Sequence, residues 1–133
     1  MSAFGDYAEL RTLDFWFKAN SLTTNDPANV YVSLHTGDPG DTGANEATTG
    51  GYTRKAQTFG SAATATDGTT SISSNADITI GPFSGSATFT HMGIWDASSS
   101  GNFIAGGALS SSRSVVSSDQ IKFNSGNITV SLA

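Results

Sequence analysis

Hydrophobic residues near the N-terminus recur every three or four positions, which predicts a helix over about residues 6–19. The repeating positions are Tyr7, Leu10, Leu13 and Phe17. Asp6 is the expected N-cap, and Glu9 follows three residues later, as in a capping box. Phe15, Trp16 and Phe17 stand next to one another, so the helix is apolar around much of its circumference. We therefore expect it either to pack deeply on a sheet or to meet another chain.

After Pro27 the hydrophobic residues alternate with polar ones, which is the period of a β-strand. Residues 30–35 predict a half-buried strand, in which Val32 and Leu34 face inward and Ser33 and His35 face outward. Further strands are predicted over residues 52–59, 76–80, 87–96, 103–109, 120–123 and 128–132. The strand over 87–96 should be the longest, and the last two strands should form a hairpin across the turn 124–127. The pair of glycines at 106 and 107 indicates a bulge or a close backbone approach.

These elements predict a mainly β fold with one N-terminal helix. Six to eight short strands at close intervals favour an antiparallel β-sandwich or a small barrel. The 133 residues form one expected domain, 1–133, with the helix over about 6–19 and the β part over about 29–133. The Ser/Thr/Gly-rich segment over about 60–75 is expected to be a flexible polar loop.

Charge narrows the classes of partner. Only 13% of the residues are charged, and the formal net charge is -5. Nucleic-acid binding requires clustered Lys and Arg, and the six basic residues here are scattered, so we expect no nucleic-acid partner. No apolar stretch is long enough to span a bilayer, and no ordinary signal peptide is visible, so we expect no membrane association and no secretion by that route. The chain has no cysteine, hence no disulfide and no thiolate metal site.

The loop GDPGDTGANE, residues 37–46, poses the question of an ion site. It carries Asp38, Asp41 and Glu46, but their spacing is not that of a calcium loop. Its glycines and Pro39 are typical of turns, so a turn is the preferred interpretation and calcium binding the alternative.

Catalytic constellations are scarce. His35 and His91 are the only histidines, too few for a metal site by themselves, and no Gly-x-Ser-x-Gly elbow is present. We therefore predict no catalytic residues, no cofactor-binding residues and no metal ligands. A carbohydrate-binding or hydrolase domain, with aromatic residues such as Trp95 and Phe103 lining a groove, is the remote alternative.

Three segments carry a resemblance to a known family. They are Leu34-His35-Thr36 with the later Gly-Gly-Tyr-Thr-Arg ending at Arg54, Gly93-Ile94-Trp95-Asp96 with the glycines after it, and the alternating C-terminal strand after Phe123. In this order, over nearly the whole chain, they resemble the small virion structural proteins of tailed bacteriophages. Members of that family are variously labelled head decoration (cement), minor tail or tail fibre proteins.

The resemblance implies a non-enzymatic protein of the virion, assembled in the bacterial host cytoplasm. Our first hypothesis is a capsid decoration protein that binds the outside of the major capsid protein shell, expected as a homotrimer. The second is a tail fibre, minor tail or baseplate accessory protein that contacts other tail proteins and takes part in host attachment. In either case the candidates for partner contact are Phe15, Trp16, Phe17, Arg54, Lys55 and Arg113.

Overall fold

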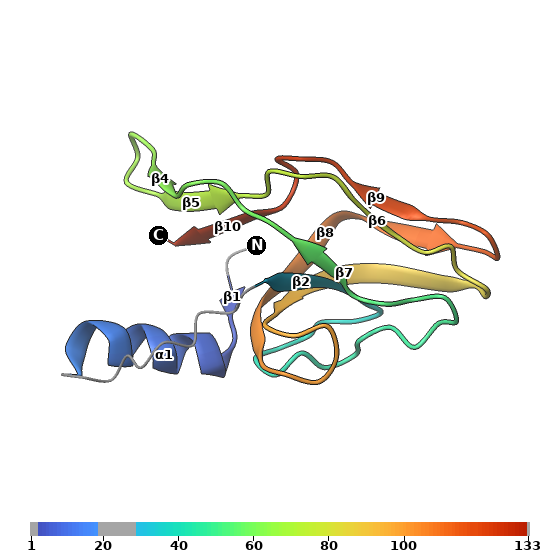
Figure 1. Ribbon diagram of the computed structural model, residues 1–133, viewed down its shortest axis with the longest axis horizontal. Helices are drawn as coiled ribbons and strands as arrows, with labels where there is room; N and C mark the ends of the chain where they lie inside the picture. Colours follow the sequence, from blue (N-terminus) through green and yellow to red (C-terminus); the bar gives the residue numbers. More distant parts are fainter. Residues whose placement is uncertain (1–2, 19–28, 133) are drawn as a thin grey trace.

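The computed structural model describes residues 3–18 and 29–132, which form one helix and ten strands (Figure 1). The chain begins with β1 (Ala3–Phe4) and α1 (Asp6–Phe17). The strands that follow are β2 (Val30–His35), β3 (Lys55–Gln57), β4 (Ala63–Thr64), β5 (Thr70–Ser73), β6 (Ile78–Ile80), β7 (Ala87–Trp95), β8 (Phe103–Val115), β9 (Ile121–Phe123) and β10 (Thr129–Leu132). The predicted segment over 60–75 thus contains the short β4–β5 pair.

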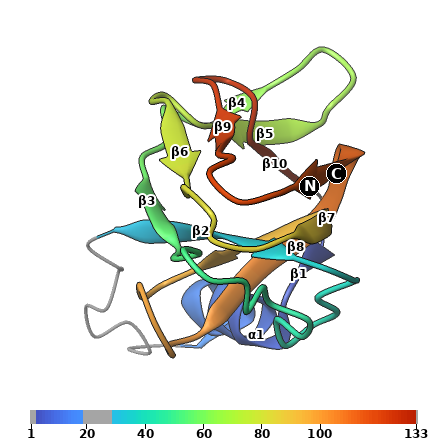
Figure 2. The same cartoon turned by 90° about the vertical axis from the view of Figure 1, so that its right-hand side faces the viewer.

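The strands form three antiparallel sheets in two layers. One layer is a five-stranded sheet in the order β1-β8-β7-β2-β3. The other contains a sheet in the order β10-β5-β4 and the pair β6-β9. Figure 2 shows the small sheets above the five-stranded sheet and α1 below it. The prediction of a mainly β, antiparallel fold with one N-terminal helix is confirmed, whereas the barrel alternative is wrong because the sheets do not close.

The hydrophobic core lies between the two layers. Val32 and Leu34 of β2 meet Ile80 of β6 and Ile121 of β9 there. The core also contains both Phe89 and Met92, which strict alternation along β7 would place on opposite faces. The register of β7 against β8 shifts between Phe89 and His91. Because of this irregularity, the side chains of β7 that face the core change from odd-numbered positions before the shift to even-numbered positions after it.

The strand β2 is buried on both faces, which differs from the predicted half-buried strand. Ser33 and His35 point away from the core, yet neither is exposed to solvent. The loops over 36–54 and 96–102 cover this second face of the sheet in Figure 1. Alternation of polar and apolar residues cannot reveal that polar side chains will be covered by loops.

The N-terminal helix begins and ends close to its predicted limits, but Asp6 is not its N-cap. Gly5 holds that position, and no side chain caps the first turn. Instead the Gly5 and Asp6 amides donate to the carbonyls of Ile104 and Asp41, which fixes the start of α1 to the sheet and to the loop. No residue of α1 is buried. The helix therefore does not pack deeply on a sheet.

Two strand predictions near the C-terminus are wrong. The last two strands do not pair with each other: β9 pairs with β6, and β10 pairs with β5. The Ser125 amide donates to Asp77 and the Gly126 amide to Ser74, so the turn before β10 binds the segment between β5 and β6, and β10 pairs with β5. The longest strand is β8 with 13 residues, whereas β7 has nine.

Candidate functional site

A buried polar network lies beneath the loops that cover β2. The His35 ring nitrogen Nδ1 is 2.7 Å from the Ala44 carbonyl oxygen, which can only accept, so Nδ1 carries the proton. The other nitrogen, Nε2, then accepts from the Ser33 hydroxyl at 2.7 Å. The Ser33 oxygen in turn accepts from the Trp95 indole N–H at 2.9 Å. Every polar atom of this row has a partner within the chain.

Arg54 forms the outer part of the same network. Its guanidinium donates two bonds to the two carboxylate oxygens of Glu46, at 2.7 and 2.8 Å, and lies 3.7 Å from the centre of the Trp95 ring. Its third nitrogen donates to the carbonyls of Ala97 and Ser100. One side chain thus joins the loop over 36–54, the loop over 96–102 and the end of β7. Only 6% of the Arg54 side chain is exposed.

The electrostatics of the network favour one protonation state. Burial lowers the pKa of His35, so the ring is held neutral. Burial by itself would raise the pKa of Glu46, but the hydrogen bonds from Arg54 and Tyr52 outweigh it and bring this pKa below its usual value. Burial and the bond to Glu46 raise the pKa of Tyr52, whose hydroxyl donates to that carboxylate at 2.7 Å.

This network contains a Ser–His pair but does not have the geometry of a catalytic centre. Ser33 and His35 are both 0% exposed. The serine oxygen also accepts from Trp95, and the far side of the histidine holds a backbone carbonyl instead of a carboxylate. A substrate cannot reach the hydroxyl. The arrangement holds two loops on the sheet.

The loop over 37–46 is an ordered turn. The Asp38 carboxylate accepts from the Gly40 amide at 2.8 Å, and the Asn45 side chain donates to the Asp38 carbonyl. Gly43 has a φ of +81°, and a Cβ at this position would lie 2.5 Å from the Trp95 ring. Within residues 3–18 and 29–132, no three His, Asp or Glu side chains are grouped closely enough to hold a metal ion.

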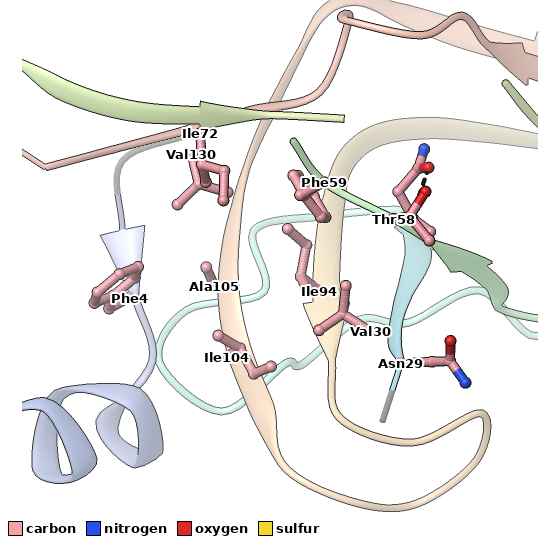
Figure 3. A pocket seen from close by; sticks show the side chains of 11 residues that line it. Phe4, Asn29, Val30, Thr58, Phe59, Ile72, Ile94, Ile104, Ala105 and Val130 are labelled. Carbon is pink, nitrogen blue, oxygen red and sulfur yellow. Dashed lines mark hydrogen bonds between the residues drawn. The ribbon is translucent and has the colours of Figure 1, made fainter. Parts of the chain in front are cut away.

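An apolar groove of about 520 Å³ opens between the two layers (Figure 3). Ile94 and Ile104 of the five-stranded sheet form one wall, and Ile72 and Val130 of the small sheet form the other. Phe4 of β1 lies at one side of it. The groove offers apolar surface and few polar groups, so it suits an apolar side chain or helix better than a polar substrate.

The six predicted contact residues do not gather in one place. Phe15, Trp16 and Phe17 lie on the last turn of α1 and are exposed by 51%, 71% and 82%. Lys55 is half-buried on β3, and Arg113 is exposed on β8. Arg54, by contrast, is committed to the internal network and offers no free guanidinium to a partner.

The sequence analysis missed the network that Arg54 completes. Ser33 and Glu46 were seen only as a strand residue and a turn residue. The available signal was the placement of Glu46, Tyr52 and Arg54 within nine residues, since an Arg so close to a Glu can form a bidentate pair. Nothing in the sequence indicated the contacts with Ala97 and Ser100, which lie more than 40 residues away.

Comparison with known proteins adds one finding. A family model described as podophage GP4 fiber I protein gp80 matches residues 3–131. No curated protein matches the chain. Among the residues that the structure describes, no helix is long and apolar enough to cross a membrane.

Proposed function

We propose that this chain, which belongs to the podophage GP4 fiber I protein family, is a non-enzymatic component of a phage tail fibre that takes part in host attachment. The observation that carries the proposal is the family match over residues 3–131, nearly the whole chain. It favours the second hypothesis of the sequence analysis over capsid decoration, which had been placed first.

The geometry of the buried network supports a non-enzymatic role. The Ser33–His35 pair is closed to solvent, and the two covering loops are fixed by Arg54 and Glu46. A fixed loop layer with no reactive group at its surface suits a protein that must keep its shape on the outside of a particle.

We expect the chain to assemble with further copies of itself, as a homotrimer, through α1. Within the described part of the chain, five of the seven exposed large hydrophobic side chains lie on this helix. They are Leu10, Leu13, Phe15, Trp16 and Phe17. An aromatic side chain has a surface of about 150–250 Å². With their exposed fractions, the three aromatic side chains of α1 together leave roughly 300–500 Å² of apolar surface exposed to solvent. That is a substantial part of the ~800 Å² that one partner contributes to a standard interface.

The apolar groove of Figure 3 is the surface that we expect α1 of a neighbouring copy to enter. An amphipathic helix in an apolar groove is a common mode of recognition. Because the helix and the groove are different surfaces of one chain, the contact is heterologous. Such a contact closes a ring, here the expected trimer, when the rotation between copies closes, and it gives an open filament when the rotation does not.

The composition of purified particles tests the fibre proposal. Quantitative mass spectrometry should find this chain at a few per cent of the major capsid protein or less, and antibody labelling should place it on the tail. A ratio near one per capsid subunit would overturn the fibre proposal and restore capsid decoration. Absence from the particle would overturn both.

Self-assembly is tested separately with Trp16→Ser/Phe17→Ser. Sedimentation of the purified wild-type chain should give a trimer and the double variant a monomer. Val116→Ser is the matched control, since Val116 is also exposed, by 57%, but lies at the end of β8 away from α1. A wild-type chain that is monomeric at high concentration, or a double variant that remains trimeric, would refute assembly through α1.

A further inference from the structure

A second hollow, of about 490 Å³, lies on a different part of the molecule. Its walls come from the second half of β8 and from β9 with the turn that precedes β10. It differs from the apolar groove in chemistry: Arg113 and Lys122 bring positive charge, Ser110 and Ser111 bring hydroxyls, and Met92 and Phe123 bring apolar surface. We call it the basic cleft.

An irregularity of β8 shapes the basic cleft. Ala108 pairs with His91 and Arg113 pairs with Phe89, so the four residues over 109–112 of β8 stand opposite the single residue Thr90. This bulge supplies Ser110 and Ser111 to the wall. Bulges of this kind redirect side chains and are frequent next to binding sites.

The bulge also determines where Arg113 points. Residues paired across antiparallel strands share one face of the sheet, and Phe89, the partner of Arg113, is fully buried in the core. Arg113 therefore stands on the core-facing side of β8, yet it is exposed, because the basic cleft opens there between the layers.

The charge of the basic cleft is only partly neutralised by the described residues. The Arg113 side chain has no hydrogen bond or ion pair with any of them. Lys122 has one ion pair, with Asp77 at 3.5 Å, and both side chains are more than half exposed. In a chain with 11 acidic and six basic residues, two of the six line one concave surface. This surface would attract an anion, whereas most of the molecule would repel one.

From these observations we propose that the basic cleft binds an acidic saccharide, that is, sugar rings that carry a carboxylate or a phosphate group. The Arg113 guanidinium can hold either anion with two parallel hydrogen bonds, and Lys122 adds a second charge. The hydroxyls of Ser110 and Ser111 can bond sugar hydroxyls, and the Phe123 side chain offers an apolar surface to the C–H face of a ring. The volume is within the ~300–1,000 Å³ that is usual for small-ligand sites.

This inference rests on the proposed role in host attachment and specifies the ligand that the fibre protein would recognise on a bacterial surface. A simple anion or an acidic peptide would use the same two cations. The saccharide is favoured because hydroxyl groups and apolar surface lie beside the charges within one cleft.

The test is an NMR titration of the full chain with four probes: tetragalacturonate, glucose 6-phosphate, neutral maltotetraose and inorganic phosphate. At least one acidic probe should shift the amide signals of residues 108–113 and 122–129, and maltotetraose should leave them in place. Whichever acidic probe binds identifies the anion as a carboxylate or a phosphate. Arg113→Gln should weaken that binding about ten-fold or more, since a charged hydrogen-bonded pair is lost. Lys55→Gln, which removes a half-buried cation outside the cleft, should leave it unchanged.

Three outcomes would overturn the inference. They are no shift with either acidic probe, equal binding of maltotetraose, and equal binding of inorganic phosphate alone, which would make the basic cleft a simple anion site. The Tm of the Arg113→Gln variant serves as a control. A Tm equal to that of the wild type shows that the variant is folded and that a loss of binding does not come from unfolding. The composition of purified particles tests the fibre proposal independently of the saccharide inference. A protein that is located on the tail but binds no acidic saccharide would refute this inference and leave the proposed fibre role unchanged.

Discussion

Replacing Arg54 by alanine should destabilise the protein more than replacing any other basic residue. The substitution removes both bonds to Glu46, both bonds to the carbonyls of Ala97 and Ser100, and the contact with the Trp95 ring. Breaking one side of a buried ion pair costs about 3–5 kcal/mol. Water recovers part of this loss because a quarter of the Glu46 side chain is exposed and the Ser100 carbonyl is accessible. We expect a loss of about 3–4 kcal/mol in the free energy of unfolding.

Urea unfolding followed by tryptophan fluorescence measures this loss directly, because Trp95 lies under Arg54. In a chain of this length a loss of about 3–4 kcal/mol lowers Tm by roughly 10–15 °C. Lys55→Ala, at the next position on the chain, should change the free energy of unfolding by less than about 0.5 kcal/mol. A double-mutant cycle with Glu46→Ala should show a coupling of about 1 kcal/mol or more. A loss below about 1 kcal/mol for Arg54→Ala, or no coupling, would show that the network does not hold the loops.

Three further predictions concern the same loop layer. Because burial lowers the pKa of His35 in the folded state below its usual value of about 6.5, the unfolded chain binds more protons in the window below that pH. Stability should therefore be complete above pH 6.5 and fall as the pH drops toward 5. His35→Asn should flatten this slope in Tm, and an unchanged slope would contradict the assignment. Gly43→Ala should lower the free energy of unfolding by several kcal/mol, because the new Cβ would overlap Trp95. Gly40→Ala should lower it by only about 1–2 kcal/mol, because Gly40 has a φ of +58° but open space around it. Equal Tm values for the two variants would refute the close contact with Trp95. Millimolar Ca²⁺ should leave Tm unchanged, since the Asp38 carboxylate is used within its own turn, and a rise of several degrees would revive the ion-site alternative.

The parts of this fold that sequence could predict are those fixed by local pattern. Alternation located β2 and β6, because a strand that packs one face on a core must repeat every two residues. The spacing of Tyr7 and Leu10 located α1 because residues three or four apart lie on one face of a helix, although no residue of α1 is buried in the core. Gly106 was expected at a close backbone approach, and a Cβ there would lie 2.7 Å from the Phe103 and Pro39 side chains.

The failures have one physical cause, which is competition from distant residues. The turn over 124–127 favoured a local hairpin, but the amides within it bind Asp77 and Ser74, so β9 and β10 pair with different strands. The bulge of β8 likewise could not be predicted from the sequence. Only the pairing with β7 defines which residues of β8 have no partner on the neighbouring strand. The network around Arg54 could not be predicted for the same reason, because its hydrogen-bond partners span positions 46 to 100.

The helix α1 and the basic cleft lie on opposite sides of the five-stranded sheet. Figure 2 shows α1 below that sheet and β9 above it, and β9 contributes a wall of the basic cleft. The apolar groove that we expect to receive α1 lies above the sheet, like the basic cleft, but the two share no lining residue. We therefore expect assembly to leave the basic cleft of each copy open to a ligand. This arrangement predicts that the two activities separate: Trp16→Ser/Phe17→Ser should lose the trimer but bind the acidic saccharide with wild-type affinity for each chain, and Arg113→Gln should show the reverse. Both assays use the same purified proteins. Loss of saccharide binding in the monomeric double variant would mean that the site is completed by a neighbouring copy, and the separation of the two surfaces would then be wrong.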